Sequence, residues 1–193
     1  WARCRDSRWC TYTSAPTLRS RMISSGSWLS SLKLEASGKP FLWALRAEGW
    51  APPAGWEERA GKRGMLVRGW APQTAILAHP AVGAFLTHCG WGSTVESFAF
   101  GHPLVMLPFV VDQPLIARAM AERGIGVEVA RDVKDGSFDR DGVAVAVRRV
   151  MVDDEGKVLA SNAKKLQEVL ADQERQERYI DDVVKHLRCY KDA

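Results

Sequence analysis

The chain has 193 residues, a formal net charge of +4, and 46% hydrophobic and 26% charged residues. This composition is that of an ordinary globular protein, and the length is sufficient for one domain with a buried core. No apolar run approaches the roughly 20 residues that cross a bilayer, the start lacks a signal-peptide pattern, and the four cysteines show neither metal nor disulfide spacing. We therefore expect a cytoplasmic protein without a membrane span or a metal site.

The excess positive charge belongs to residues 1–28, which hold five arginines and one acidic residue. Basic and acidic residues balance over the rest of the chain, and no nucleic-acid-binding motif is present, so no nucleic acid partner is expected. Residues 1–28 are rich in Ser, Arg, Trp and Cys and show neither a helical nor a strand period. We interpret them as an atypical leader, either disordered or non-native, and residues 29–193 as the functional domain.

The first regular elements of that domain lie between Leu32 and Ala78. Residues 32–38 read as the end of a helix stopped by Gly38. Strands are predicted over 41–46 and 65–68, separated by a variable loop over 47–64 that is rich in Gly, Pro and charged residues. A short helix is predicted over 73–78.

A continuous apolar run over 82–87 indicates a strand buried on both faces. A turn with two glycines follows, and then Ser93 with Glu96 three residues later. This spacing is a capping box, so we predict a helix that begins at about Ser93. A strand, a glycine-rich turn and a helix N-terminus together form a typical phosphate-binding arrangement.

The same plan repeats with a strand over 104–107, a short loop, and a helix over 116–122. In an open α/β sheet, ligands bind beyond the carboxyl ends of the strands. We therefore expect four polar side chains to meet at one edge of the sheet: His88, Ser93, Asp112 and Gln113.

The remaining elements alternate in the same way. A strand is predicted over 126–129, a polar turn over 132–136, and a helix over 139–152 with Asp139 as its N-cap. From about residue 155 to 190, apolar residues recur at spacings of three and four, which predicts one or two amphipathic helices.

The stretch from Trp70 to Gln113 resembles the signature box of plant family-1 UDP-dependent glycosyltransferases, which act on secondary metabolites. The resemblance has no gap and includes Trp70-Ala-Pro-Gln, His88-Cys-Gly-Trp, Ser93, Glu96 and Asp112-Gln113. It implies a Rossmann-like α/β domain with a parallel sheet. This domain would be the C-terminal, UDP-sugar-binding half of a two-domain GT-B fold.

The resemblance also implies a role for each residue of the site. Trp70 would stack on uracil and the Ala71 backbone would pair with the uracil edge. Gln73 and Glu96 would bind the ribose hydroxyls, and His88 and Ser93 the diphosphate. The sugar hydroxyls would contact Trp91, Asp112 and Gln113.

Gly92 departs from the family, which usually has Asn at this position. The backbone N–H remains, but the lost amide donor would weaken phosphate binding by roughly 1.5–3 kcal/mol. In the family the final Gln, here Gln113, is associated with UDP-glucose more than with UDP-galactose. Glucose, rhamnose and other sugars remain open. We expect no site role for His79, Cys89 or His102, and we interpret Cys89 as an inert core thiol.

The implied reaction inverts the anomeric centre in one displacement, with UDP-sugar as co-substrate and neither a metal nor a cofactor. The catalytic His and the acceptor site belong to the family's N-terminal half, so the chain alone is expected to be inactive. A non-catalytic UDP-sugar-binding protein and a pseudogene product are the alternatives. The acceptors suggested by the resemblance are flavonoid or terpenoid glycosides. In the family the last helix crosses to the other half, which would leave its apolar face exposed here.

Overall fold

The computed structural model describes residues 9–13, 34–45, 52, 54–138 and 140–191. Six parallel strands form one sheet in the order β3-β2-β1-β4-β5-β6. The strands are β1 (Trp9–Thr13), β2 (Phe41–Leu45), β3 (Gly64–Arg68), β4 (Val82–Thr87), β5 (Leu104–Met106) and β6 (Gly126–Glu128). The strands predicted from residue 41 onward are all confirmed, with ends that differ by at most one residue.

Strand β1 corrects the interpretation of the leader, because we predicted no strand before residue 29. Its five residues pair in parallel with β2 on one side and with β4 on the other, so they form the centre of the sheet. The sequence Trp-Cys-Thr-Tyr-Thr is rich in aromatic and β-branched residues, which favour strands. The rest of the leader lies outside the described residues, and its interpretation as disordered or non-native stays a prediction.

Helices connect the strands. They are η1 (Leu34–Ser37), α2 (Trp56–Ala60), η2 (Gly61–Arg63), α3 (Gln73–Leu77), α4 (Trp91–Ala99), α5 (Gln113–Glu122), α6 (Arg140–Met151), α7 (Asp154–Ala171) and α8 (Gln173–Lys191). The predicted loop over 47–64 thus contains a helix, α2, that the sequence did not indicate. Trp56 of α2 is buried against the rings of Phe41 and Trp43. The N-cap predicted at Asp139 lies outside the described residues.

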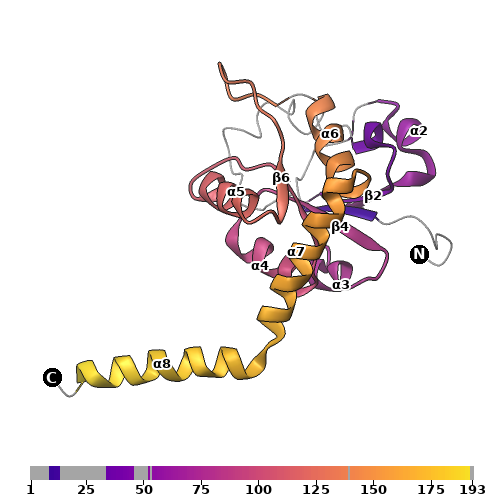
Figure 1. The fold of residues 1–193 in the computed structure, drawn as a ribbon. Coiled ribbons are helices and arrows are strands. Elements are labelled where there is room, and N and C mark those ends of the chain that lie inside the picture. Colours follow the sequence, from indigo (N-terminus) through magenta and orange to yellow (C-terminus); the bar gives the residue numbers. More distant parts are fainter. Residues whose placement is uncertain (1–8, 14–33, 46–51, 53, 139, 192–193) are drawn as a thin grey trace.

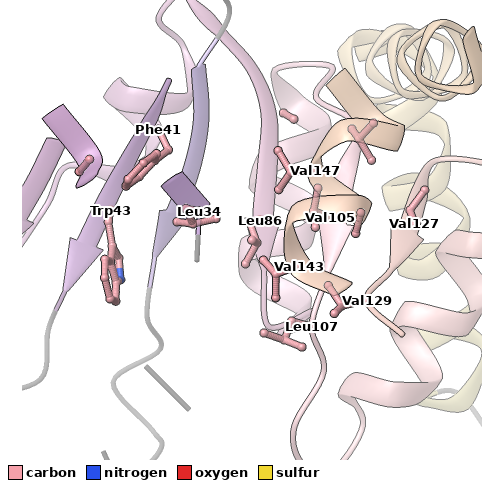
Figure 2. Close-up of a cluster of buried hydrophobic side chains, with 14 of the residues drawn as sticks. Leu34, Phe41, Trp43, Leu86, Val105, Leu107, Val127, Val129, Val143 and Val147 are labelled. Carbon is pink, nitrogen blue, oxygen red and sulfur yellow. The ribbon is translucent and has the colours of Figure 1, made fainter. Parts of the chain in front are cut away.

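Alternate residues of the central strands face opposite sides of the sheet. On one side, Leu86 of β4 and Val105 of β5 pack against Val143 and Val147 of α6. Figure 2 shows this cluster, with Phe41 and Trp43 of β2 continuing it toward α2. These side chains are almost fully buried, which confirms that the strands lie between two layers of helices.

The other side of the sheet is covered by α3, α4 and α5. Phe85 of β4 and Met106 of β5 pack there with Phe98 of α4 and Met120 of α5. Helix α7 joins the two sides, because Leu159 belongs to the first cluster whereas residue 163 belongs to the second. The result is a doubly wound three-layer domain.

Helix α8 leaves this domain and projects away from it (Figure 1). Its apolar residues are exposed, as the sequence led us to expect: Tyr179, Ile180, Val183, Val184, Leu187 and Tyr190. Neither α8 nor any other helix in the described part of the chain combines the length and apolarity needed to cross a membrane.

Candidate functional site

The strand order places the reversal of the sheet between β1 and β4, and ligands of doubly wound domains bind at the carboxyl ends of the strands near such a point. Strand β4 ends at Thr87, and α4 begins at Trp91 with Gly90 as its N-cap. The helix predicted to begin at about Ser93 is confirmed, and it begins two residues earlier. No side chain caps this helix, so Ser93 and Glu96 do not form a capping box.

Two threonines that the sequence analysis did not single out hold the turn between β4 and α4. The N–H of Cys89 donates to Thr87 Oγ1 at 3.2 Å, and Thr94 Oγ1 donates to the carbonyl of Gly90 at 3.0 Å. Cys89 adopts a φ of 65°, which is uncommon for a residue other than glycine. The first intrahelical bond of α4 joins Thr94 N–H to Gly90, so the preceding N–H groups of the helix remain directed at the turn.

His88 lies in this turn with its ring over Gly90. A Cβ at residue 90 would lie 2.4 Å from His88 Nε2, so a glycine is needed for this close approach rather than for its backbone angles. His88 Nδ1 is buried and has no hydrogen-bond partner. Burial lowers the pKa of His88, and the negative charge of Asp112 opposes that shift. A further anion beside the ring would oppose the effect of burial in the same way as Asp112 does.

Three of the predicted site residues form one polar cluster across two helices. Gln73 is the first residue of α3, and its Nε2 donates to Glu96 Oε2 at 2.7 Å and to Ser93 Oγ at 3.3 Å. Because a carboxylate has about four lone-pair positions, Glu96 retains acceptors for other donors. The cluster orients a carboxylate next to the N-terminus of α4.

The two tryptophans of the site are both exposed to solvent. Trp70 follows β3 and is 77% exposed, and Trp91 is 59% exposed. Ala71 is buried between the sheet and α3, where it packs with Leu42 and residue 44. Gly92 is exposed, and a Cβ added to it would have no atom within 4 Å.

Asp112 and Gln113 follow β5 at the same edge. Helix α5 begins at Gln113, earlier than the predicted start at 116, with Asp112 as its N-cap residue. Gln113 Oε1 accepts hydrogen bonds from the N–H groups of Phe109 and Val110 at 2.9 and 3.1 Å. The amide oxygen of Gln113 is therefore used within the loop that precedes α5. The amide nitrogen is the polar group of this side chain that a ligand can contact.

A pocket of about 310 Å³ lies at the opposite edge of the sheet, near the amino ends of β4 and β5, and is lined by His79, His102 and Lys164. His102 lies in the loop between α4 and β5, as predicted, and it is buried there with its Nε2 donating to the carbonyl of Leu77 at 2.6 Å. His79 Nδ1 accepts from the Ala81 N–H at 3.2 Å. These structural contacts account for both histidines at this edge.

Cys89 is fully buried, and burial raises the pKa of its thiol to about 12. This supports its interpretation as an inert core thiol. Within the described residues, no group of three or more His, Cys, Asp or Glu side chains is placed to hold a metal ion.

A doubly wound parallel sheet with polar groups at its carboxyl edge defines the class of nucleotide-binding Rossmann-like domains. The particular family follows from the family model for UDP-glucoronosyl and UDP-glucosyl transferase, which matches residues 23–179. The chain therefore belongs to this family.

Curated plant relatives support this family assignment. The chain is 44% identical over 157 residues to UDP-glycosyltransferase 91C1 of Arabidopsis thaliana, and 45% identical over 161 residues to soyasaponin III rhamnosyltransferase of Glycine max. These matches cover 81% and 82% of the chain and 34% of each relative. The chain thus spans about a third of the length of the curated relatives it matches.

Solved structures show the same fold. Phytolacca americana UGT2, complexed with UDP-2fluoro-glucose and pterostilbene, has a TM-score of 0.73 and 31% identity, covering 82% of this chain and 36% of that one. Os79 from O. sativa, in complex with UDP, has a TM-score of 0.72 and 35% identity, covering 84% and 36%. These similarities confirm the predicted Rossmann-like α/β architecture of GT-B glycosyltransferases.

Proposed function

We propose that this chain binds the UDP-sugar donor of a glycosyltransferase at the carboxyl edge of its sheet. The observation that carries the proposal is the cluster of Gln73, Ser93 and Glu96 in the first turns of α3 and α4. Trp70, three residues before Gln73, has an exposed ring. Helix N-termini favour phosphates, and a carboxylate accepts hydrogen bonds from a ribose diol. The matching structures that hold UDP or UDP-2fluoro-glucose support the same assignment.

In this proposal each group of residues recognises one part of the donor. Trp70 stacks on uracil with the Ala71 backbone at its edge, and Gln73 and Glu96 bind the ribose. His88, Ser93 and the N–H of Gly92 bind the diphosphate. The sugar is bound by Trp91, Asp112 and Gln113.

The complete protein would transfer the sugar, with inversion, to a hydroxyl group of a small plant metabolite. The acceptor oxygen would bond to the anomeric carbon as the bond to the β-phosphate oxygen breaks, and UDP would leave. His88 and backbone N–H groups would stabilise the charge on its diphosphate, without a metal or another cofactor. The base and the acceptor pocket would come from residues outside this chain, which spans 34% of its relatives. We place the reaction in the cytoplasm, because the cysteines show no disulfide spacing.

The sugar and the acceptor are proposed from the relatives. The name β-D-glucosyl crocetin β-1,6-glucosyltransferase, from Gardenia jasminoides, denotes an acceptor that already carries a sugar. The soyasaponin III rhamnosyltransferase name denotes a different sugar. We propose transfer of glucose to a flavonoid or terpenoid glycoside, with rhamnose as the competing donor sugar.

Calorimetric titration with UDP tests donor binding. We expect Trp70→Ala to weaken UDP binding roughly 5- to 150-fold, because stacking on a base contributes about 1–3 kcal/mol. Glu96→Ala should weaken binding as well by removing the ribose acceptor. Tyr179→Ala and Glu122→Ala remove an exposed aromatic ring and an exposed carboxylate elsewhere, and should leave affinity unchanged. Equal affinity in all five proteins, or none in the folded wild type, would overturn the proposal.

A further inference from the structure

Residues 108–112, which we call the loop, belong to the connection between β5 and α5, end at Asp112 and have an unfavourable backbone. Val111 has a φ of 58° and is 91% exposed. A β-branched residue rarely adopts this conformation, and an exposed side chain has no packing that would enforce it. Contacts from elsewhere must therefore hold the loop in place.

One set of contacts comes from Gln113, whose side chain accepts the N–H groups of Phe109 and Val110. The other set comes from Arg131, which follows β6 and is distant in the sequence. Its Nη2 donates to the carbonyl of Pro108, the first residue of the loop. Gln113 and Arg131 thus hold different residues of the loop in place.

Arg131 also makes contacts within its own turn, residues 131–138. It pairs with Phe138 in an antiparallel bridge, and its Nη1 donates to the carbonyl of Gly136 at 2.7 Å. Within that turn, Asp132 Oδ1 accepts from the Lys134 N–H at 2.7 Å. These contacts orient the guanidinium group.

The guanidinium also lies 5.6 Å from the ring centroids of both Phe109 and Phe138, which are 6.2 Å apart in an edge-to-face arrangement. Phe109 belongs to the loop and Phe138 to the turn. The planar, forked guanidinium can contact two rings and two carbonyl groups at once, which a lysine ammonium cannot do. This arrangement connects the loop rigidly to the turn.

We propose that Arg131 is a positioning residue for sugar recognition. It holds residues 108–112 so that Asp112 meets the hydroxyls of the donor sugar, and it makes no contact of its own with UDP. This inference rests on the proposed donor site, because it concerns the sugar end of that site. Arg131 should therefore influence which sugar binds and leave the binding of UDP unchanged.

The test compares the affinities for UDP, UDP-glucose and UDP-galactose in wild type, Arg131→Lys and Phe138→Leu. We expect both variants to bind UDP as wild type does. The ratio of their affinities for UDP-glucose and UDP-galactose should fall roughly three- to tenfold, which is the effect of one misplaced hydrogen bond. Arg123→Lys is the matched control, because Arg123 donates to Ala119 within α5 and touches no part of the loop. It should retain the preference.

The outcomes separate this inference from the proposed function. Failure of wild type to bind UDP would overturn the donor site itself. Normal UDP binding with an unchanged sugar preference in Arg131→Lys, or no preference in wild type, would overturn only the role of Arg131. A parallel loss of UDP and UDP-sugar binding would also overturn it, since that result indicates general destabilisation. The double variant Arg131→Lys/Asp112→Ala should show no less preference than Asp112→Ala alone.

Discussion

Gly92 stands where the resemblance to the family's signature box implies an asparagine. Nothing lies within 4 Å of a Cβ added to this residue, and its φ is not left-handed, so the fold accepts a side chain there. The open space lies at the N-terminus of α4, beside the N–H groups that we assign to the diphosphate. The site thus has room at position 92 for a side-chain hydrogen-bond donor, which glycine does not supply.

We predict that Gly92→Asn strengthens UDP binding roughly tenfold or more, because a hydrogen bond to a charged group contributes about 1.5–3 kcal/mol. Gly92→Ala occupies the same initial space without an amide and should change affinity by less than about twofold. Calorimetry with UDP measures both variants. Equal effects of Asn and Ala would refute the assignment of this position to a phosphate.

Two buried histidines predict how stability depends on pH. Burial lowers the pKa of both His88 and His102 below 6.5, the ordinary value. As pH falls through 6.5, the unfolded chain takes up protons that the folded chain does not, so the free energy of unfolding should decrease. Above that pH these two histidines should not make the free energy of unfolding depend on pH.

Urea denaturation at pH 7.5 and at pH 5.5 measures this effect. The wild type should be less stable at the lower pH, and His102→Gln should show a smaller difference between the two. His186→Gln, which replaces an exposed histidine on α8, is the control and should behave as wild type. A stability that rises toward pH 5.5 would contradict the account.

At the scale of elements, α7 and α8 look alike in the sequence but contribute differently to the domain. Both are amphipathic, yet α7 buries Leu159 and residue 163 in the two halves of the core. No described side chain of α8 is buried. The domain's stability should therefore depend on α7 and not on α8.

We predict that a chain ending at residue 172 unfolds with a free energy within about 1 kcal/mol of the full chain, as expected for the loss of surface groups. By contrast, Leu159→Ala should cost roughly 2–5 kcal/mol, because it leaves a cavity in the core. Denaturant titration of both proteins tests the contrast. A large loss on removing α8 would show that its apolar face packs on the domain.

The strands and helices that could be predicted are those whose pattern is complete within a short segment. The apolar run of β4 between turn residues is one example. Helix α4 started earlier than predicted because Ser93 and Glu96 bond Gln73 of another helix instead of capping their own. Helix α2 was missed because Trp56 is held by Phe41 and Trp43, contacts that no local pattern shows.

At the scale of the whole molecule, the sequence order of the elements determines where the site lies. The central strand β1 was missed because its five residues are embedded in a Ser- and Arg-rich segment, and its neighbours in the sheet come from β2 and β4. The residues assigned to UDP-sugar could be proposed from the sequence because they lie in one continuous stretch. The contribution of Arg131 could not be predicted from the sequence, because Arg131 contacts Pro108 only in the folded chain.

The central claim is that UDP binds at the carboxyl edge of this sheet. Amide hydrogen exchange with and without saturating UDP tests it most directly, because it reports where the ligand lies. The account predicts slower exchange at Trp91, Gly92 and Ser93, where α4 begins, and no change near His79 and Gly101 at the opposite edge. UDP binding that protects the pocket at that opposite edge, or that leaves the start of α4 unchanged, would contradict it.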